Sequence, residues 1–181
     1  FGTQTLMGRT RMQAAVPITV SDRLRTWSGP LQNHLQRLEQ IRPRLELLQL
    51  GGAVGDRAAF STHATDIAAD MATELGLGNP ETSWHATRDG MADYANLLSL
   101  ISGSIGKIGQ DICLMAQQGS GEIGMATGGG SSAMPHKQNP ILAELLVTLA
   151  RFNATQLSGM HAQLIPERDR SSTCQGLYFM D

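Results

Sequence analysis

The sequence lacks any strong excess of charge of one sign. Its 181 residues carry 14 Lys and Arg against 16 Asp and Glu, so the formal net charge is -2. A balance of this kind offers no basic surface for nucleic acid and no polybasic patch for a membrane. A small anionic substrate must therefore be held by a few local cations.

Long apolar runs are also absent. No stretch approaches the roughly 18 residues of a membrane span, and no charged and then apolar signal segment precedes the body of the sequence. We therefore expect a soluble protein located in the cytoplasm. Because the first residue is Phe1 and motif-like density begins at once, we also expect an internal fragment of a longer protein.

Cysteine is scarce and scattered. Cys113 and Cys174 lie far apart, and neither belongs to a CxxC pair or to a Cys/His cluster with metal-ligand spacing. Both are expected to be free thiols in a reducing compartment. No metal site is expected.

Apolar residues recur at helical spacing in several segments of the chain. The first stripe runs from Leu24 to Leu48, and Ser21 and Asp22 are suitable N-cap residues for the start of its helix. Pro30 and Pro43 fall inside the stripe, where each removes a backbone donor. The helix should be kinked or broken near one of them.

Three further helices follow from the same spacing. One is expected from about Asp56 to Leu75, and the last from near Pro140 to Leu157. Between them lies the most regular stripe, made by Tyr94, Leu98, Ile101, Ile105, Ile108, Ile112 and Met115. Gly103, Gly106 and Gly109 lie in the same helix and are expected to permit close approach of a neighbouring helix.

The fold predicted from these segments is all-α, because no segment shows convincing period-two alternation. Long helices should form a bundle, with the loops carrying the chemistry. Since the stripes are too long and apolar to bury one another alone, a homo-oligomer with a shared core is expected.

A glycine-rich loop runs from Gly128 to Pro140 and contains the string GSSAMPHKQNP. Its composition alone is typical of a flexible Gly/Ser linker that leads into a helix. The whole string resembles the signature loop of the fumarase/aspartase superfamily, GSSxMPxKxNP, with every fixed position present. The resemblance implies a long-helix bundle of that type and an enzyme that requires no cofactor.

The resemblance also implies roles for residues of the loop. In that superfamily the first serine acts on the proton alpha to a carboxylate, which makes Ser131 and Lys137 the candidate catalytic residues. Ser132, Met134 and Asn139 are the candidate substrate-binding residues of the loop. Proton removal beside a carboxylate builds an aci-carboxylate with doubled negative charge, which Lys137 and backbone amides would stabilise.

A second conserved region of the superfamily resembles GRTRMQAAVP, residues 8–17. Lyases such as adenylosuccinate lyase carry a histidine directly after the threonine, where this chain has Arg11. An arginine stays charged and gives up no proton, which argues against protonation of a leaving group. Arg11 is therefore expected to bind substrate carboxylates, with Thr10 and Gln13 supplying neutral hydrogen bonds. Arg9 is equally suited to a structural ion pair and is not placed in the site.

Within the superfamily, this region resembles bacterial 3-carboxy-cis,cis-muconate cycloisomerases, which have GRT-x-x-Q without the histidine. That subgroup converts a triacid to a carboxymuconolactone in aromatic (protocatechuate) catabolism. A lyase of the adenylosuccinate or argininosuccinate type that releases fumarate and a related sulfomuconate cycloisomerase remain alternatives. The non-enzyme alternative is a helical oligomerisation scaffold.

The resemblance extends from Gly8 to about Arg168, and superfamily members are more than twice as long as this chain. We therefore interpret residues 1–181 as a central helical-bundle domain without the N-terminal and C-terminal domains of the family. The implied assembly is a homotetramer whose active sites combine regions from three subunits. The implied partner is a small polycarboxylate substrate, with no nucleic acid and no membrane.

Overall fold

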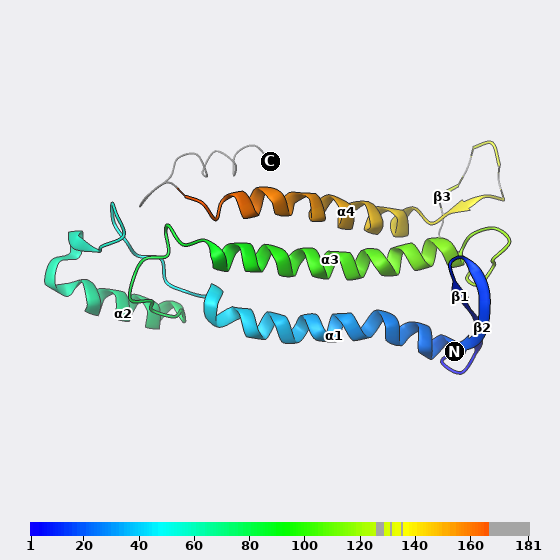
Figure 1. Ribbon diagram of the computed structural model, residues 1–181, viewed down its shortest axis with the longest axis horizontal. Coiled ribbons are helices and arrows are strands. Elements are labelled where there is room, and N and C mark those ends of the chain that lie inside the picture. The colour runs from blue at the N-terminus through cyan, green and yellow to red at the C-terminus, as the bar shows by residue number, and fades with distance from the viewer. Residues whose placement is uncertain (126–128, 131, 135, 167–181) are drawn as a thin grey trace. The chain divides into compact units, whose positions relative to one another are not determined.

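The structure is a computed structural model in which residues 1–125, 129–130, 132–134 and 136–166 are described. Three long helices dominate it, namely α1 (Val20–Leu45), α3 (Asp89–Met115) and α4 (Ile141–Ala162) (Figure 1). The shorter elements are β1 (Thr5–Thr10), β2 (Gln13–Thr19), the 3-10 helix η1 (Ala58–His63), α2 (Ala64–Leu75), β3 (Gly129–Gly130) and β4 (Gln138–Asn139). The long-helix class predicted from the sequence is confirmed. Among the described helices, none combines the length and the apolar character needed to cross a membrane.

The sequence analysis missed an antiparallel β-hairpin at the start of the chain. Strands β1 and β2 pair from Thr5 opposite Thr19 to Thr10 opposite Gln13, with an irregularity between Met7 and Arg9. In β1 only Leu6 and Gly8 are buried, and β2 is exposed along most of its length. Period-two alternation needs one buried face, and two buried positions in β1 with none in β2 are too few to produce a convincing pattern.

Helix α1 begins one turn earlier than expected, and Thr19 caps it rather than Ser21 or Asp22. The Asp22 amide donates to Thr19 Oγ1 at 3.1 Å, and the Asp22 carboxylate accepts from the amide and the hydroxyl of Thr19 at 2.9 and 2.7 Å. This reciprocal pair is a capping box, with aspartate at the third helical position. It therefore joins the end of β2 directly to the start of α1.

The helix boundaries differ from the predicted ones at two places. Helix α1 is continuous through Pro30 and ends at Leu45, two residues beyond Pro43. The segment expected to be helical from Asp56 instead forms η1, and α2 begins only at Ala64. Ser61 has a φ of 52° inside η1, a left-handed conformation that interrupts a regular helix.

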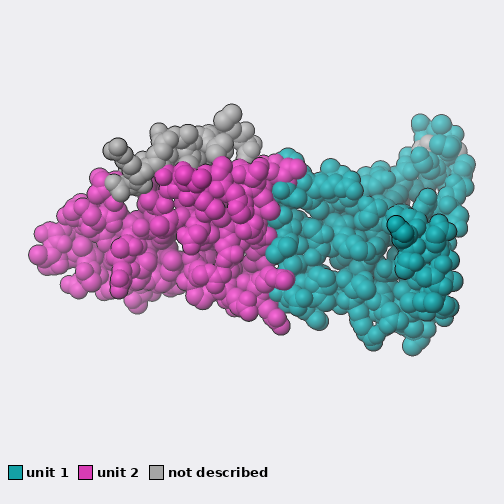
Figure 2. All heavy atoms as spheres, in the orientation of Figure 1, with its two compact units in different colours: residues 1–35, 99–154 teal, residues 36–98, 155–181 magenta. Residues whose placement is uncertain are grey.

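The chain divides into two compact units, the first made of residues 1–35 and 99–154 and the second of residues 36–98 and 155–181 (Figure 2). In the first unit, α3 approaches α4 closely through two glycines. A Cβ added to Gly106 would lie 2.5 Å from Ala150 Cβ, and one added to Gly109 would lie 2.6 Å from the Ala143 carbonyl oxygen. The predicted role in close helix packing is thus confirmed at these two positions. It is wrong for Gly103 within the part of the chain that the structure describes, because a Cβ added there would have no atom within 4 Å.

The second unit has a small apolar core of its own. Leu48, Ala68 and Ala72 are buried together, and Leu50 and Leu77 pack against them. Outside this core, the guanidinium of Arg57 donates to the carbonyl oxygens of Leu50 and Pro80 at 2.8 and 3.0 Å. These contacts stabilise the turns around α2.

We predict that Thr19→Ala lowers the free energy of unfolding of the intact protein by about 1 kcal/mol, because it removes the side-chain half of the capping box. Urea denaturation followed by circular dichroism measures the loss. Thr26→Ala is the matched control, since the Thr26 hydroxyl donates to the Arg23 carbonyl within the same helix and takes no part in the capping box. Equal losses for the two variants would contradict the capping role.

The same capping box predicts a pH dependence of stability. Hydrogen bonds from Thr19, the backbone amide first, hold the pKa of Asp22 below its ordinary value of 3.8. A depressed folded-state pKa stabilises the fold above that ordinary value, and the contribution is lost as the pH falls through the folded pKa. Below pH 3.8, Asp22→Asn should therefore lose less stability on acidification than the unsubstituted protein. Parallel acid titration curves for the two proteins would contradict this.

Candidate active site

The tip of the β1–β2 hairpin places Arg11 in a strained turn. Thr10 and Gln13 face each other as the last strand pair, so Arg11 and Met12 are the two central turn residues. Their φ angles are 48° and 66°, and the favoured two-residue hairpin turn requires positive values at both positions. Asn and Gly usually occupy such turns because other side chains are strained there. The turn conformation therefore fixes the position of the Arg11 backbone at the tip of the hairpin.

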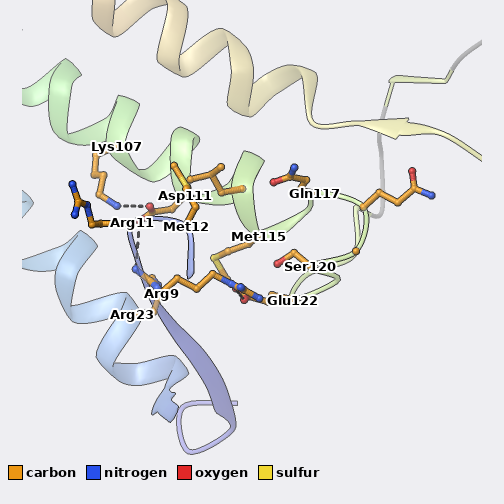
Figure 3. A pocket seen from close by; sticks show the side chains of 13 residues that line it. Arg9, Arg11, Met12, Arg23, Lys107, Asp111, Met115, Gln117, Ser120 and Glu122 are labelled. Carbon is orange, nitrogen blue, oxygen red and sulfur yellow. Dashed lines mark hydrogen bonds and ion pairs between the residues drawn. The ribbon is translucent and has the colours of Figure 1, made fainter. Parts of the chain in front are cut away.

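A cavity of about 490 Å³ lies beside this turn, within the first unit (Figure 3). Its charged lining residues are Arg9, Arg11, Arg23, Lys107, Asp111 and Glu122. Four cations against two carboxylates give the wall a net charge of +2. The cavity therefore has a local excess of positive charge in a chain of net negative charge.

Asp111 of α3 organises one side of this basic cavity. Asp111 is only 8% exposed, and one of its carboxylate oxygens accepts a hydrogen bond from Trp27 Nε1 at 2.7 Å. The other oxygen pairs with the Lys107 ammonium one turn earlier on the same helix. Arg23 of α1 completes the group, with Nη1 3.9 Å from the Asp111 carboxylate. The carboxylate thus joins α1 to α3 and holds two cations at the cavity wall.

An ion pair ties the hairpin to the segment that follows α3. Arg9 Nε donates to Glu122 Oε1 at 2.8 Å, and the Glu122 side chain is largely buried. The expectation that Arg9 suits a structural ion pair is confirmed. Arg9 is thereby neutralised, whereas Arg11 on the turn has no paired carboxylate among the described residues.

The signature loop lies against a second cavity, of about 590 Å³, in the same unit. Met134, Lys137 and Asn139 line it together with Cys113 and Glu144. The loop is closed by the β3–β4 ladder and by a hydrogen bond from the Lys137 amide to the Met134 carbonyl at 2.9 Å. Several loop side chains are therefore held at one wall.

The two groups of predicted site residues do not meet in one cavity of this chain. Arg11 lines the basic cavity, Lys137 lines the second one, and the two cavities share only Gln117 and Gln118. Three other predicted residues, Thr10, Gln13 and Ser132, are exposed and line neither cavity. Ser131 lies outside the described residues. The site assignments remain predictions.

Sequence reasoning missed the cavity residues contributed by the helices. Arg23, Lys107 and Asp111 carry no motif, and the i, i+4 spacing of Lys107 and Asp111 was the only available signal. Such a pair is usually a solvent-exposed contact of little consequence. Only the burial of Asp111 and its contact with Trp27 distinguish this one.

Cys113 is the free thiol of the second cavity. Burial, and after it the negative charge of Glu144, raise the pKa of its thiol above the ordinary value. A raised pKa disfavours the thiolate, which is the nucleophilic form. Cys113 is therefore suited to packing at the cavity wall rather than to covalent chemistry.

Comparison with known proteins identifies the class to which this fold and these loops belong. Residues 3–154 match the lyase family, so the chain belongs to that family. The resemblance inferred from the signature loop is confirmed.

The individual relatives of this chain are particular enzymes within that family. The chain is 43% identical over 169 residues to the 3-carboxy-cis,cis-muconate cycloisomerase of Pseudomonas aeruginosa, across 92% of this chain and 37% of that protein. It superposes on the 3-carboxy-cis,cis-muconate lactonizing enzyme of Pseudomonas putida with a TM-score of 0.86 and 38% identity, across 97% of this chain and 39% of that one. It is also 34% identical to the N-acetyl-S-(2-succino)cysteine lyase of Dickeya dadantii, across 93% of this chain and 38% of that protein. The chain thus spans about two-fifths of the length of these relatives.

The strained turn yields a prediction about side-chain shape. Met12→Val should lower the free energy of unfolding by about 1 to 2 kcal/mol, because a β-branched side chain tolerates positive φ poorly. Met12→Asn should cause no loss, since asparagine adopts this conformation readily. Denaturant melts of the intact protein measure both effects.

The control is the same exchange in the extended part of the hairpin. Met7→Val places a β-branched residue in β1, where strand geometry favours it, and should change stability by less than about 0.5 kcal/mol. A loss at Met7 as large as that at Met12 would show that volume, and not backbone strain, is responsible.

Proposed function

We propose that the intact protein is a cycloisomerase that converts 3-carboxy-cis,cis-muconate to a carboxymuconolactone in aromatic catabolism. The observation that carries this proposal is the basic cavity around Arg11, where the related lyases have a histidine. A guanidinium binds carboxylates and cannot act as a general acid. The cycloisomerase names of the relatives at 43% and 38% identity agree with this choice.

The reaction needs no external nucleophile. One carboxylate of the triacid adds to a double bond of the same molecule, forming the C–O bond of the lactone, and a proton adds to the carbon alpha to another carboxylate. No group leaves, and the added proton lowers the negative charge of the substrate by one. Holding the chain of the substrate in a bent form supplies much of the acceleration through proximity.

Residues of the signature loop are assigned to the proton transfer. Ser131 would deliver the proton, and Lys137 with nearby backbone amides would stabilise the charge that builds on the adjacent carboxylate. Asn139 would hold a carboxylate, with Ser132 and Met134 in contact with the substrate. The placement of Met134, Lys137 and Asn139 at one cavity wall supports this grouping.

Residues of the hairpin are assigned to substrate binding. Arg11 would clamp a carboxylate bidentately, and Thr10 and Gln13 would donate neutral hydrogen bonds at either end of the turn. The strained turn supports the assignment, because local backbone strain is common where a side chain must be held for function. No cofactor is required, since the nucleophile belongs to the substrate.

The proposed assembly is a homotetramer in the cytoplasm, with each active site built from several subunits. The separation of Arg11 and Lys137 into different cavities supports this, since one chain leaves each group incomplete. Large apolar side chains exposed on α4 also support it, namely Ile141, Leu142, Leu145, Leu149 and Phe152. Such a surface marks an interface.

A lyase activity is the second candidate, because a relative at 34% identity is an N-acetyl-S-(2-succino)cysteine lyase. That reaction class breaks a bond to a heteroatom beside a carboxylate and leaves an alkene. Both reactions involve a proton alpha to a carboxylate, so the loop alone does not separate them. Arg11 favours cyclisation, since a leaving group that requires protonation would find no acid there.

We expect the intact protein to bleach the ultraviolet absorbance of 3-carboxy-cis,cis-muconate and to form the lactone in a 1:1 ratio. Ser131→Ala should lower kcat by about 10²- to 10⁴-fold, the usual contribution of a general acid. Its elution on size-exclusion chromatography should not change. Ser158→Ala is the matched control, because that hydroxyl donates to the Thr155 carbonyl within α4 and lies outside the signature loop.

Each other outcome identifies an alternative. An unchanged diene absorbance together with release of an alkene from a succinylated substrate favours the lyase. Turnover of a sulfonated muconate alone favours the sulfomuconate enzyme. Inactivity on every substrate, with Ser131→Ala indistinguishable from the unsubstituted protein, favours a helical scaffold.

A further inference from the structure

We propose that Arg23 and Lys107 bind one carboxylate of a polyanionic substrate in the basic cavity, alongside Arg11, and that Asp111 is the residue that positions them. The inference rests on the proposed function, because it adds a carboxylate subsite to the same reaction. It concerns residues outside both conserved motifs, on the helices α1 and α3.

Arg23 has hydrogen-bonding capacity that the protein does not use. Its Nε atom is buried and has no hydrogen-bond partner among the residues that the structure describes, and its Nη1 lies 3.9 Å from the Asp111 carboxylate, beyond hydrogen-bond distance. A buried donor without an acceptor is unfavourable, and native proteins rarely leave one. The Arg23 side chain is 21% exposed and lines the cavity, so a bound carboxylate can accept hydrogen bonds from its terminal guanidinium nitrogens.

Lys107 is similarly under-used. One of its three ammonium donors pairs with Asp111, while the side chain remains 57% exposed at the cavity wall. Figure 3 shows Lys107 beside Asp111, and both residues line the same cavity as Arg11. The ammonium therefore retains donors that a ligand can reach.

Asp111 cannot neutralise both cations. Its single negative charge is shared among Lys107, Arg23 and the indole N–H of Trp27. Since Glu122 already neutralises Arg9, the remaining three cations face one carboxylate, and a net charge of +2 is left in the cavity. The network of Asp111, Lys107 and Arg23 therefore carries one uncompensated positive charge, and Arg11 adds the second one to the cavity.

The size of the cavity agrees with a small polyanion. Its volume of about 490 Å³ falls in the range of small-molecule sites. Three separate cations on a turn and two helices suit a ligand with several carboxylates better than a monoacid. The subsite should therefore select tricarboxylates over dicarboxylates.

The test measures binding of tricarballylate, a tricarboxylate, and of succinate to the intact protein by isothermal titration calorimetry. We expect tricarballylate to bind more tightly than succinate. Arg23→Gln and Lys107→Gln should each weaken tricarballylate binding by about 10- to 100-fold, the loss of a charged hydrogen-bond partner. Arg25→Gln is the matched control, because Arg25 is on the same helix, pairs with Asp22 and does not line the cavity. Unchanged tricarballylate affinity in both variants overturns the proposal.

A kinetic measurement separates this subsite from a structural role. With 3-carboxy-cis,cis-muconate, Arg23→Gln should raise KM by about tenfold or more and leave kcat within a few-fold, and Arg23→Lys should recover part of the loss. A fall in kcat at unchanged KM overturns the subsite. If Arg23→Gln fails to fold, Lys107→Gln decides, because its exposed side chain contributes little to packing.

The two proposals can fail separately. Loss of tricarballylate affinity in both variants, without turnover of the muconate, refutes the cycloisomerase and supports the anion subsite. Turnover of the muconate with normal KM in both variants supports the cycloisomerase and refutes the subsite.

Discussion

The first unit depends on the hydrogen bond and ion pairs of the Asp111 carboxylate. This carboxylate accepts a hydrogen bond from Trp27 of α1 and pairs with Lys107 of its own helix, with Arg23 close by. A carboxylate this little exposed is costly unless it is paired and hydrogen-bonded. The same contacts that compensate for its burial bring α1 and α3 together. They also concentrate positive charge in a chain whose formal net charge is -2.

The β1–β2 hairpin contributes Arg9 and Arg11 to the same basic cavity. Its turn accepts two residues with positive φ, and the ion pair between Arg9 and Glu122 holds β1 against the segment that follows α3. The capping box at Thr19 then connects β2 to α1 without a flexible linker. Arg11 is therefore placed by three local restraints, none of which involves the signature loop.

The signature loop and the hairpin line different cavities within one chain. A chain that spans about two-fifths of its relatives contains each group of residues but does not bring them together. The exposed apolar side chains on α4 indicate where further protein surface belongs. The proposed assembly, in which loop and hairpin come from different subunits, would bring the two groups of residues together.

The sequence by itself determined the superfamily, the positions of the long helices and the identity of the loop residues, because helical periodicity and a nearly invariant string are local signals. Gly106 and Gly109 were likewise assigned correctly to close helix packing, whereas Gly103 was not. The tertiary structure alone decided the hairpin, because only Leu6 and Gly8 of its strands are buried and two positions are too few to show an alternation. It alone decided the cap at Thr19, where the helix begins before its apolar stripe. The basic cavity depended on it most of all, because Arg23 and Lys107 are 84 positions apart and only the folding of α1 against α3 brings them to one carboxylate.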